Sequence, residues 1–145
     1  MQIIVDPELK PADAEIIRKG IYAYNDALVD SPDGHLGILV KDEAGNTVGG
    51  LTGRWYYDWL FIELLWLPET IRGHDIGTKV MAEAESYALA NGMTGIWLDT
   101  FSFQARGFYE KLGYVVFGEL PGYPGPHTRY FLQKRLGGAA NPASS

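Results

Sequence analysis

The sequence predicts an α/β fold in a single domain, with helices flanking a β-sheet. Segments with the short apolar patterns of strands alternate along the chain with segments that repeat apolar residues at helical spacing. The chain has 145 residues, of which 46% are hydrophobic, which is enough for one core and too few for two domains of ordinary size. We therefore expect one domain over residues 1–135 and a flexible tail of small and polar residues over 136–145.

The first half of the chain predicts a strand, a helix, a hairpin and a central strand. The first strand covers residues 2–6, and the helix covers residues 11–28 and begins with a proline, which suits the first helical position. Strands at residues 36–41 and 47–55 flank a DEAGN turn, whose Gly and Asn accept positive φ. The next strand, residues 59–67, is apolar at nearly every position, so we expect it to be central and buried on both faces.

The second half alternates helices and strands. We predict a helix at residues 78–91, ended by an Asn-Gly pair, and a strand at 96–100. A short helix at 102–112 follows, and the sheet ends with strands at 115–119 and 128–133. The predicted order is therefore β-α-β-β-β-α-β-α-β-β.

A loop rich in glycine joins the central strand to the helix that follows it. The loop reads RGHDIGT and consists of Arg72, Gly73, His74, Asp75, Ile76, Gly77 and Thr78. A helix start presents unpaired N–H groups and the positive end of the helix dipole, and both favour an anion such as a phosphate. Arg72 adds a charge-assisted hydrogen-bond donor. The sequence contains neither the G-x-G-x-x-G motif nor the Gly-Lys-Ser or Gly-Lys-Thr ending of a P-loop, which disfavours a nucleotide-dependent kinase or ATPase.

This loop, together with residues 94–114, resembles the GNAT superfamily of acyl-CoA-dependent N-acyltransferases. The family's loop reads Arg/Gln-x-x-Gly-x-Gly/Ala; Arg72 and Gly77 fill its first and last places, and Asp75 replaces its middle Gly. The second segment, TGIWLDTFSFQARGFYEKLGY, matches a strand followed by Asn-x-x-Ala-x-x-aromatic-Tyr-x-Lys-x-Gly-aromatic, with Ser102 in place of the Asn. The two segments cover roughly a third of the chain in the family's order. The resemblance implies a mixed, mostly antiparallel sheet with a splayed parallel strand pair, flanked by helices.

The resemblance also implies that acetyl-CoA binds as co-substrate. Its pyrophosphate would lie on the glycine-rich loop, and its pantetheine arm would pair with the backbone of the first splayed strand. The implied contact residues are Leu65, Trp66 and Leu67 for the pantetheine arm, Arg72 to Thr78 for the pyrophosphate, and Ser102 and Tyr109 in the second motif. A carboxylate at Asp75 would repel a pyrophosphate, so we expect it to turn outward, toward the N–H groups of the helix start.

Acyl transfer from a thioester to an amine needs a base for the amine and an acid for the departing thiolate. The resemblance implies that Tyr109 is the acid, and a phenol with a pKa near 10 is protonated at neutral pH. Glu63 is the single ionisable residue in its apolar strand, where burial would raise its pKa into the range of a base, but an ammonium anchor or a structural role fits equally well. Asp99, at the end of the next strand, and His127, in the loop before the last strand, are the other candidate bases.

Composition excludes several other classes. A formal net charge of -6 argues against a nucleic-acid partner, and three scattered histidines without cysteine provide no metal-ligand spacing. No membrane span or signal peptide is visible, so we expect a cytoplasmic protein.

We expect a primary amine on a small molecule as acceptor, and the sequence leaves a homodimer open. The departures at Asp75 and Ser102 also leave a second class open, a domain that binds acyl-CoA, or nothing, and serves as a sensor or interaction module.

Overall fold

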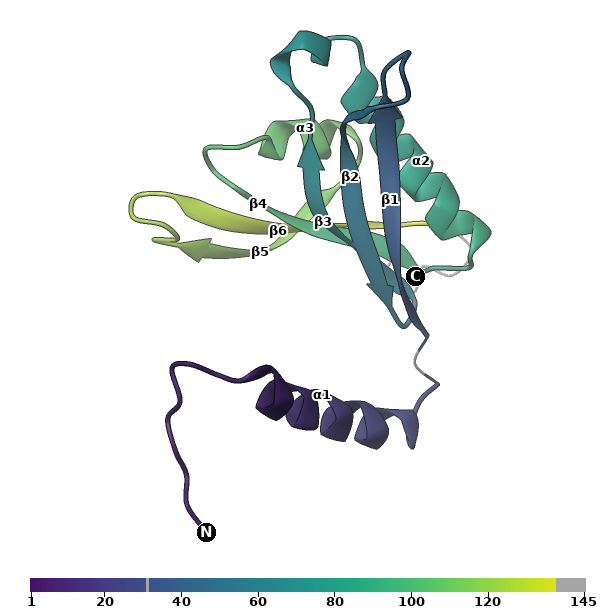
Figure 1. The fold of residues 1–145 in the computed structure, drawn as a ribbon. Helices are drawn as coiled ribbons and strands as arrows, with labels where there is room; N and C mark the ends of the chain where they lie inside the picture. Colours follow the sequence, from purple (N-terminus) through teal and green to yellow (C-terminus); the bar gives the residue numbers. More distant parts are fainter. Residues whose placement is uncertain (31, 138–145) are drawn as a thin grey trace. The chain divides into compact units, whose positions relative to one another are not determined.

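A computed structural model describes residues 1–30 and 32–137, which are drawn in colour in Figure 1. The chain divides into two compact units, Met1–Ser31 and Pro32–Ser145. The first unit contains helix α1 (Pro11–Asp26), which begins at the proline that suits a first helical position. The prediction of a strand at residues 2–6 is wrong: these residues form no regular structure and are exposed. A β-prone segment becomes a strand only when its backbone groups pair with a neighbour, and in the described chain this segment has no such partner.

The second unit is built on a six-stranded sheet with the order β1-β2-β3-β4-β6-β5. The strands are β1 (Asp33–Lys41), β2 (Thr47–Tyr56), β3 (Trp59–Trp66), β4 (Gly95–Phe101), β5 (Val115–Pro121) and β6 (Thr128–Arg135). Only the central pair, β3 and β4, runs parallel, and the other pairs are antiparallel. The mixed, mostly antiparallel sheet with one parallel pair that the sequence predicted is therefore confirmed.

Helices pack on this sheet through small and apolar side chains. Helix α2 (Ile76–Ala90) buries Val80, Met81, Ala84 and Ala88, and Figure 1 shows it passing behind β1. A one-turn helix, η1 (Glu69–Ile71), precedes it, and α3 (Arg106–Lys111) follows β4. Helix α3 begins four residues later than predicted, because residues 102–104 form a turn instead of a first helical turn. The largest fully buried core side chains are Leu51, Leu60, Met81, Ile96, Leu98, Tyr114 and Leu132.

A polar cluster at the end of α3 holds this helix in place. Lys134 Nζ donates to Glu85 Oε1 at 2.9 Å and to the Leu112 carbonyl at 2.7 Å, and the Tyr114 hydroxyl donates to Glu85 Oε2 at 3.0 Å. Half-buried, charge-assisted bonds of this kind are stronger than those on an open surface. They tie the C-terminal end of α3 to α2 and β6.

Leu136, which we expected in the flexible tail, is packed. It is 9% exposed, and its N–H donates to the Thr94 carbonyl at 2.9 Å. The ordered chain thus extends past residue 135, because the strand partner of β6 continues to offer a backbone acceptor. Residues 138–145 of the predicted tail lie outside the described residues.

Candidate active site

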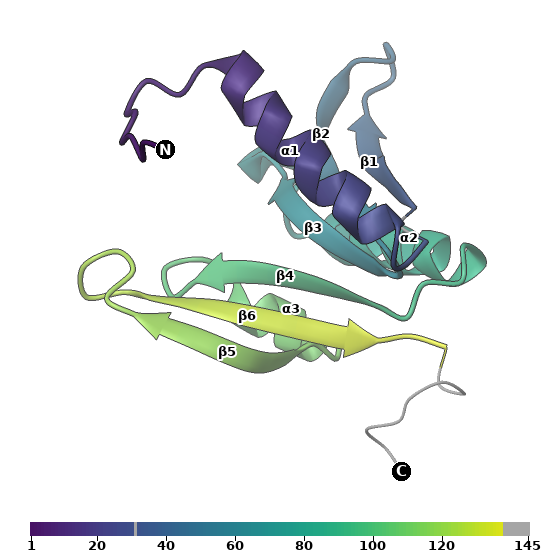
Figure 2. The same cartoon turned by 90° about the horizontal axis from the view of Figure 1, so that it is seen from below.

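The central strand pair separates halfway along its length. Hydrogen-bonded pairing of β3 with β4 runs from Trp59 opposite Gly95 to Ile62 opposite Leu98 and then stops, although both strands continue. The cause is a bulge: Ile62 pairs with Gly53 of β2 and Leu64 pairs with Thr52, so Glu63 is an extra residue. A bulge bends its strand and increases the local twist. Figure 2 shows the resulting divergence of β3 from β4.

The bulge also explains why one prediction about β3 is wrong. We expected this strand to be buried on both faces, but Leu64 is 68% exposed and Trp66 is 60% exposed. The extra residue at Glu63 shifts the alternation of β3, so Leu64 and Trp66 lie on the exposed face while Leu65 packs against the core. Beyond Ile62 the backbone edge toward β4 is also no longer paired with that strand.

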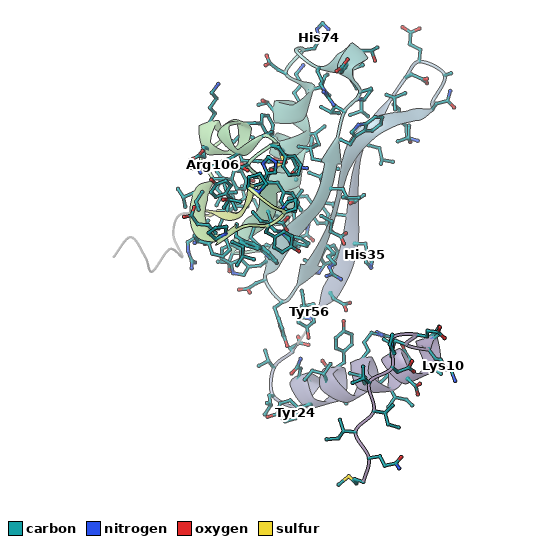
Figure 3. The ribbon with its side chains drawn as sticks, turned by 90° about the vertical axis from the view of Figure 1, so that its left-hand side faces the viewer. Lys10, Tyr24, His35, Tyr56, His74 and Arg106 are labelled. Atoms are coloured by element: carbon teal, nitrogen blue, oxygen red, sulfur yellow. The ribbon has the colours of Figure 1, made fainter. Side chains whose placement is uncertain are left out.

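The gap between the strands forms a cavity of about 990 Å³. Its walls come from the second half of β3, the loop before α2, the end of β4 and the start of α3. Most of the residues singled out from the sequence line it: Glu63, Leu65, Trp66, Leu67, Arg72, Gly73, Asp75, Ile76, Gly77, Thr78, Asp99 and Tyr109. His74 and Ser102 are not among the lining residues. His74 lies at the tip of the loop (Figure 3).

One end of the cavity carries the donors that the sequence predicted for an anion. The first intrahelical bond at the start of α2 runs from the Lys79 N–H to the Asp75 carbonyl at 3.0 Å, so the N–H groups of Ile76, Gly77 and Thr78 precede the helical ladder. Arg72 Nε donates to the Leu67 carbonyl at 2.8 Å, which fixes the arginine beside the cavity. The positive helix end and the guanidinium together suit a phosphate.

Asp75 adopts a backbone conformation that favours glycine. Its φ of 58° and ψ of 19° are left-handed, and its side chain makes no capping hydrogen bond to α2. The expected capping contact is therefore not formed, since the left-handed backbone is not the extended conformation from which a side chain caps a helix. The same geometry explains the glycine at the matching place of the family motif, because a side chain costs about 1 kcal/mol or more in this region.

Replacing Asp75 by glycine tests this reading of the loop. Asp75→Gly should raise the free energy of unfolding by up to about 1 kcal/mol, because it removes the left-handed strain. Acetyl-CoA should bind equally well or more tightly, since a carboxylate beside the pyrophosphate is also removed. Thermal unfolding and calorimetry measure the two effects. A marked loss of affinity would show that the Asp75 side chain supports the loop.

Tyr109 lies on α3 at the other end of the cavity. It is 9% exposed, and its ring packs edge-on against Phe108 and Tyr114 at centroid distances of 5.1 and 6.2 Å. Burial, and to a lesser degree the negative charge of Asp99, raise the pKa of Tyr109 to about 12. Both effects disfavour the phenolate, so the hydroxyl is protonated at neutral pH and can donate to a nearby anion.

The three candidate bases lie in different surroundings. Glu63 is exposed, contrary to our expectation of burial, because it follows the buried Ile62 on β3 and therefore points to the opposite face of the sheet; its Oε2 lies 3.8 Å from Arg54 Nε. Asp99 is more buried and forms a closer ion pair, with Oδ2 2.8 Å from Arg129 Nη2. That aspartate raises the pKa of Arg129 through a hydrogen bond. His127 does not line the cavity.

Ser102 is engaged elsewhere. Its hydroxyl lies 3.3 Å from His127 Nδ1 and accepts a hydrogen bond from the Thr128 N–H at 3.1 Å, so it ties the turn after β4 to the start of β6. Gln104, which the sequence did not single out, lines the cavity instead; its Oε1 accepts from Thr100 Oγ1 and the Phe101 N–H. A polar residue in a turn gives no sequence signal for such a position.

The described part of the chain contains no group of three or more His, Cys, Asp or Glu side chains placed to hold a metal ion. In residues 1–30 and 32–137, no helix has the length and apolarity that crossing a membrane requires.

A sheet that opens between two parallel strands, with a helix start at one end of the gap and a buried tyrosine at the other, is the arrangement that the resemblance to the acyltransferase family implied. The sequence profile of the Acetyltransferase (GNAT) family matches residues 4–114. The chain therefore belongs to this family and is an acetyltransferase by class, which confirms the resemblance seen in the sequence.

Several known proteins are similar to this chain. It is 34% identical to Acetyltransferase Atu2258 of Agrobacterium fabrum over 86% of this chain and 94% of that protein. It is 38% identical to blasticidin-S acetyltransferase of Streptomyces morookaense over 65% of this chain and 70% of that protein. A crystal structure of an acetyltransferase from Bacillus cereus is 33% identical, with a TM-score of 0.84 over 93% of this chain and 98% of that one. An aminoglycoside 6'-N-acetyltransferase complexed with coenzyme A, 16% identical, shares the fold with a TM-score of 0.62 over 93% of this chain and 97% of that one.

Proposed function

We propose that this protein transfers the acetyl group of acetyl-CoA to a primary amine on a small-molecule acceptor, by direct attack in a ternary complex. The observation that carries the proposal is the cavity between β3 and β4, which joins the helix start of α2 to the Tyr109 hydroxyl. Acetyl-CoA is long enough to place its pyrophosphate on the loop before α2 and its thioester near the bulge in β3, at the two ends of this cavity. The similarity to a blasticidin-S acetyltransferase and an aminoglycoside acetyltransferase supports a small acceptor.

The proposed contacts follow the walls of the cavity. The N–H groups at the start of α2 and Arg72 would hold the pyrophosphate. The open edge of β3, from Leu65 to Leu67, would pair with the amides of the pantetheine arm, as an added strand pairs with an exposed sheet edge. Ser102 was expected to contact the cofactor; with its hydroxyl used by Thr128, Gln104 is the better candidate in this turn.

The chemical step needs two proton transfers. The amine nitrogen attacks the thioester carbonyl carbon, the new C–N bond forms and the C–S bond breaks. The amine passes one proton to the base, and the departing thiolate takes a proton from Tyr109; water then returns the proton from the base to the tyrosine, so the enzyme is regenerated. No covalent intermediate is required, which suits a chain without cysteine.

Glu63 is our candidate for the base. It lies at the bulge where β3 leaves β4, and its ion pair with Arg54 is 3.8 Å long. Asp99 is held by Arg129 at 2.8 Å, so one of its carboxylate oxygens is already engaged by a guanidinium.

Glu63→Gln should lower the turnover number at neutral pH and remove an ionisation from the acid side of the pH–rate profile, because an amide cannot accept the amine proton. The measurement is the pH dependence of the turnover number and of kcat/KM, with Asp99→Asn as the comparison. If Glu63→Gln raises only the KM for the amine, Glu63 is an ammonium anchor, and Asp99 or a water chain takes the proton.

The experiment that tests the proposal is thiol release from acetyl-CoA with a panel of primary amines. Amine-dependent release, with the acetylated amine confirmed by mass, is the expected result. Binding of acetyl-CoA without any amine-dependent release would instead favour the sensor class that Asp75 and Ser102 left open.

A further inference from the structure

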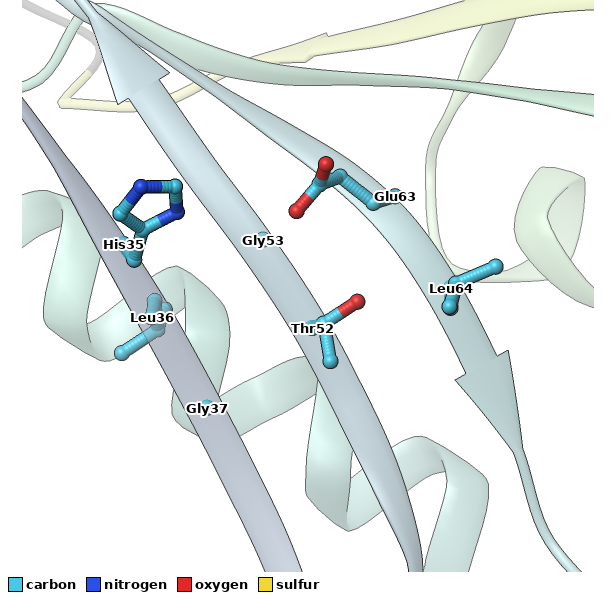
Figure 4. A pocket seen from close by; sticks show the side chains of 7 residues that line it. All are labelled: His35, Leu36, Gly37, Thr52, Gly53, Glu63 and Leu64. Atoms are coloured by element: carbon cyan, nitrogen blue, oxygen red, sulfur yellow. The ribbon is translucent and has the colours of Figure 1, made fainter. Parts of the chain in front are cut away.

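A second hollow, of about 610 Å³, lies on the sheet beside the bulge (Figure 4). It spans β1, β2 and β3, and the side chains of His35, Thr52 and Glu63 line it. Residues alternate between the two faces of a strand, and on β1 the neighbours of His35 and Gly37 are the ones that turn toward the core. Gly37 leaves the hollow open where a larger side chain would fill it.

The hollow meets the cavity at the bulge. Glu63 and Leu64 line both spaces, and no other residue does so in the part of the chain that the structure describes. A molecule in the hollow can therefore place one end at the Glu63 carboxylate, where the proposed thioester is also found. The donor cavity and the hollow are then two parts of one reaction site.

The hollow carries little net charge. The carboxylate of Glu63 is opposed by Arg54, which lies 3.8 Å away on β2, and Thr52 contributes a neutral hydroxyl. His35 can accept or donate a hydrogen bond through its ring nitrogens. A second ammonium group or a phosphate on the ligand would gain little electrostatic stabilisation in such a place. Hydroxyl or amide groups, in contrast, can form hydrogen bonds with Thr52 and His35.

We propose that this hollow is the acceptor subsite, and that it holds a neutral, hydroxyl- or amide-bearing part of an amine whose amino group reaches Glu63. The inference rests on the proposed N-acetyltransferase function and specifies its substrate class. An acceptor of this kind is a hydroxylated amine such as an amino sugar, in contrast to an alkyl amine or a polyamine. His35 and Thr52 are specificity residues that contact its polar groups.

Gly37→Val tests the subsite by filling it. A Cβ at Gly37 would meet only the Leu39 side chain, at 3.6 Å, which is an ordinary contact, and valine is favoured in strands. The variant should therefore fold while it occupies the hollow. We expect the KM for glucosamine to rise about tenfold or more, with the Kd for acetyl-CoA unchanged. Gly37→Ala should give a smaller rise, and Lys41→Val, outside the hollow on the same strand, should give none.

Three primary amines test the chemical class. Glucosamine should have a kcat/KM about tenfold or more above those of cyclohexylamine and 1,4-diaminobutane, and Thr52→Val or His35→Phe should reduce this preference. An equal or reversed preference, or a Gly37→Val enzyme with an unchanged KM for its best amine, would overturn the inference.

Calorimetric binding of glucosamine to the coenzyme A complex separates the two proposals. Binding that Gly37→Val abolishes, without turnover of any amine, supports the subsite and contradicts the proposed activity. Turnover of an amine that Gly37→Val leaves unaffected supports the activity and contradicts the subsite. If no amine is turned over and glucosamine does not bind, both proposals are contradicted.

Discussion

Removing the Tyr109 hydroxyl should reduce turnover roughly 10- to 1000-fold, the usual scale of a lost acid catalyst, while acetyl-CoA still binds. Tyr109→Phe keeps the ring that packs against Phe108 and Tyr114 and deletes only the proposed donor to the thiolate. The pKa of about 12 also sets the pH dependence. The phenol is protonated below this pKa, so Tyr109 should cause no loss of turnover between about pH 7 and pH 10.

Tyr87→Phe is the matched control. Tyr87 lies on α2, is half-buried and does not line the cavity, so deleting its hydroxyl should leave turnover unchanged. Single-turnover kinetics and calorimetry on both variants separate chemistry from binding. Near-normal turnover in Tyr109→Phe would show that Tyr109 is not the acid. A lost affinity for acetyl-CoA would show that its hydroxyl binds the cofactor.

Reversing the charge of Arg72 should weaken acetyl-CoA binding by about 2 kcal/mol or more, which is roughly 30-fold or more in Kd. Arg72→Glu removes a guanidinium that Leu67 holds beside the start of α2 and places a carboxylate in the path of the pyrophosphate. The loss should shrink as salt is raised, because the added repulsion is partly screened at the exposed cavity mouth.

Lys19→Glu makes the same change in net charge on α1, in the other unit of the chain, and should leave the affinity for acetyl-CoA unchanged. Arg72→Lys should fall between the wild type and Arg72→Glu, because lysine keeps the charge but loses the fork of donors. Calorimetry on these variants, with circular dichroism as the folding check, decides the loop assignment. An unchanged affinity for acetyl-CoA in correctly folded Arg72→Glu would contradict the assignment of this loop to the pyrophosphate.

Local signals in the sequence predicted most of the fold and both ends of the cavity. The DEAGN turn predicted the β1–β2 hairpin, and the apolar run before a glycine-rich loop predicted the central strand and the helix start behind it. Tyr109 was found through the spacing of its motif. These features depend on residues close together in the chain, where turn chemistry and helix capping act directly.

Features that depend on distant partners could not be read in the same way. Residues 2–6 have the composition of a strand but no pairing partner among the described residues, and Ser102 fills a motif position but is bonded to Thr128. His35 belongs to no motif in the sequence. It lines the hollow that we propose for the acceptor only because β1 and β3 lie on either side of β2.

The sequence by itself thus determined the class of protein, and it predicted the loop that we propose for the pyrophosphate and the tyrosine that we propose as the acid, because each of these lies in a contiguous motif. The tertiary structure decided where the substrates can meet. The bulge at Glu63 becomes visible only when the pairings of β3 with β2 and with β4 are both known, since a bulge is a mismatch between strands. That mismatch opens the gap that we propose for the donor, and Glu63 beside it also lines the hollow that we propose for the acceptor.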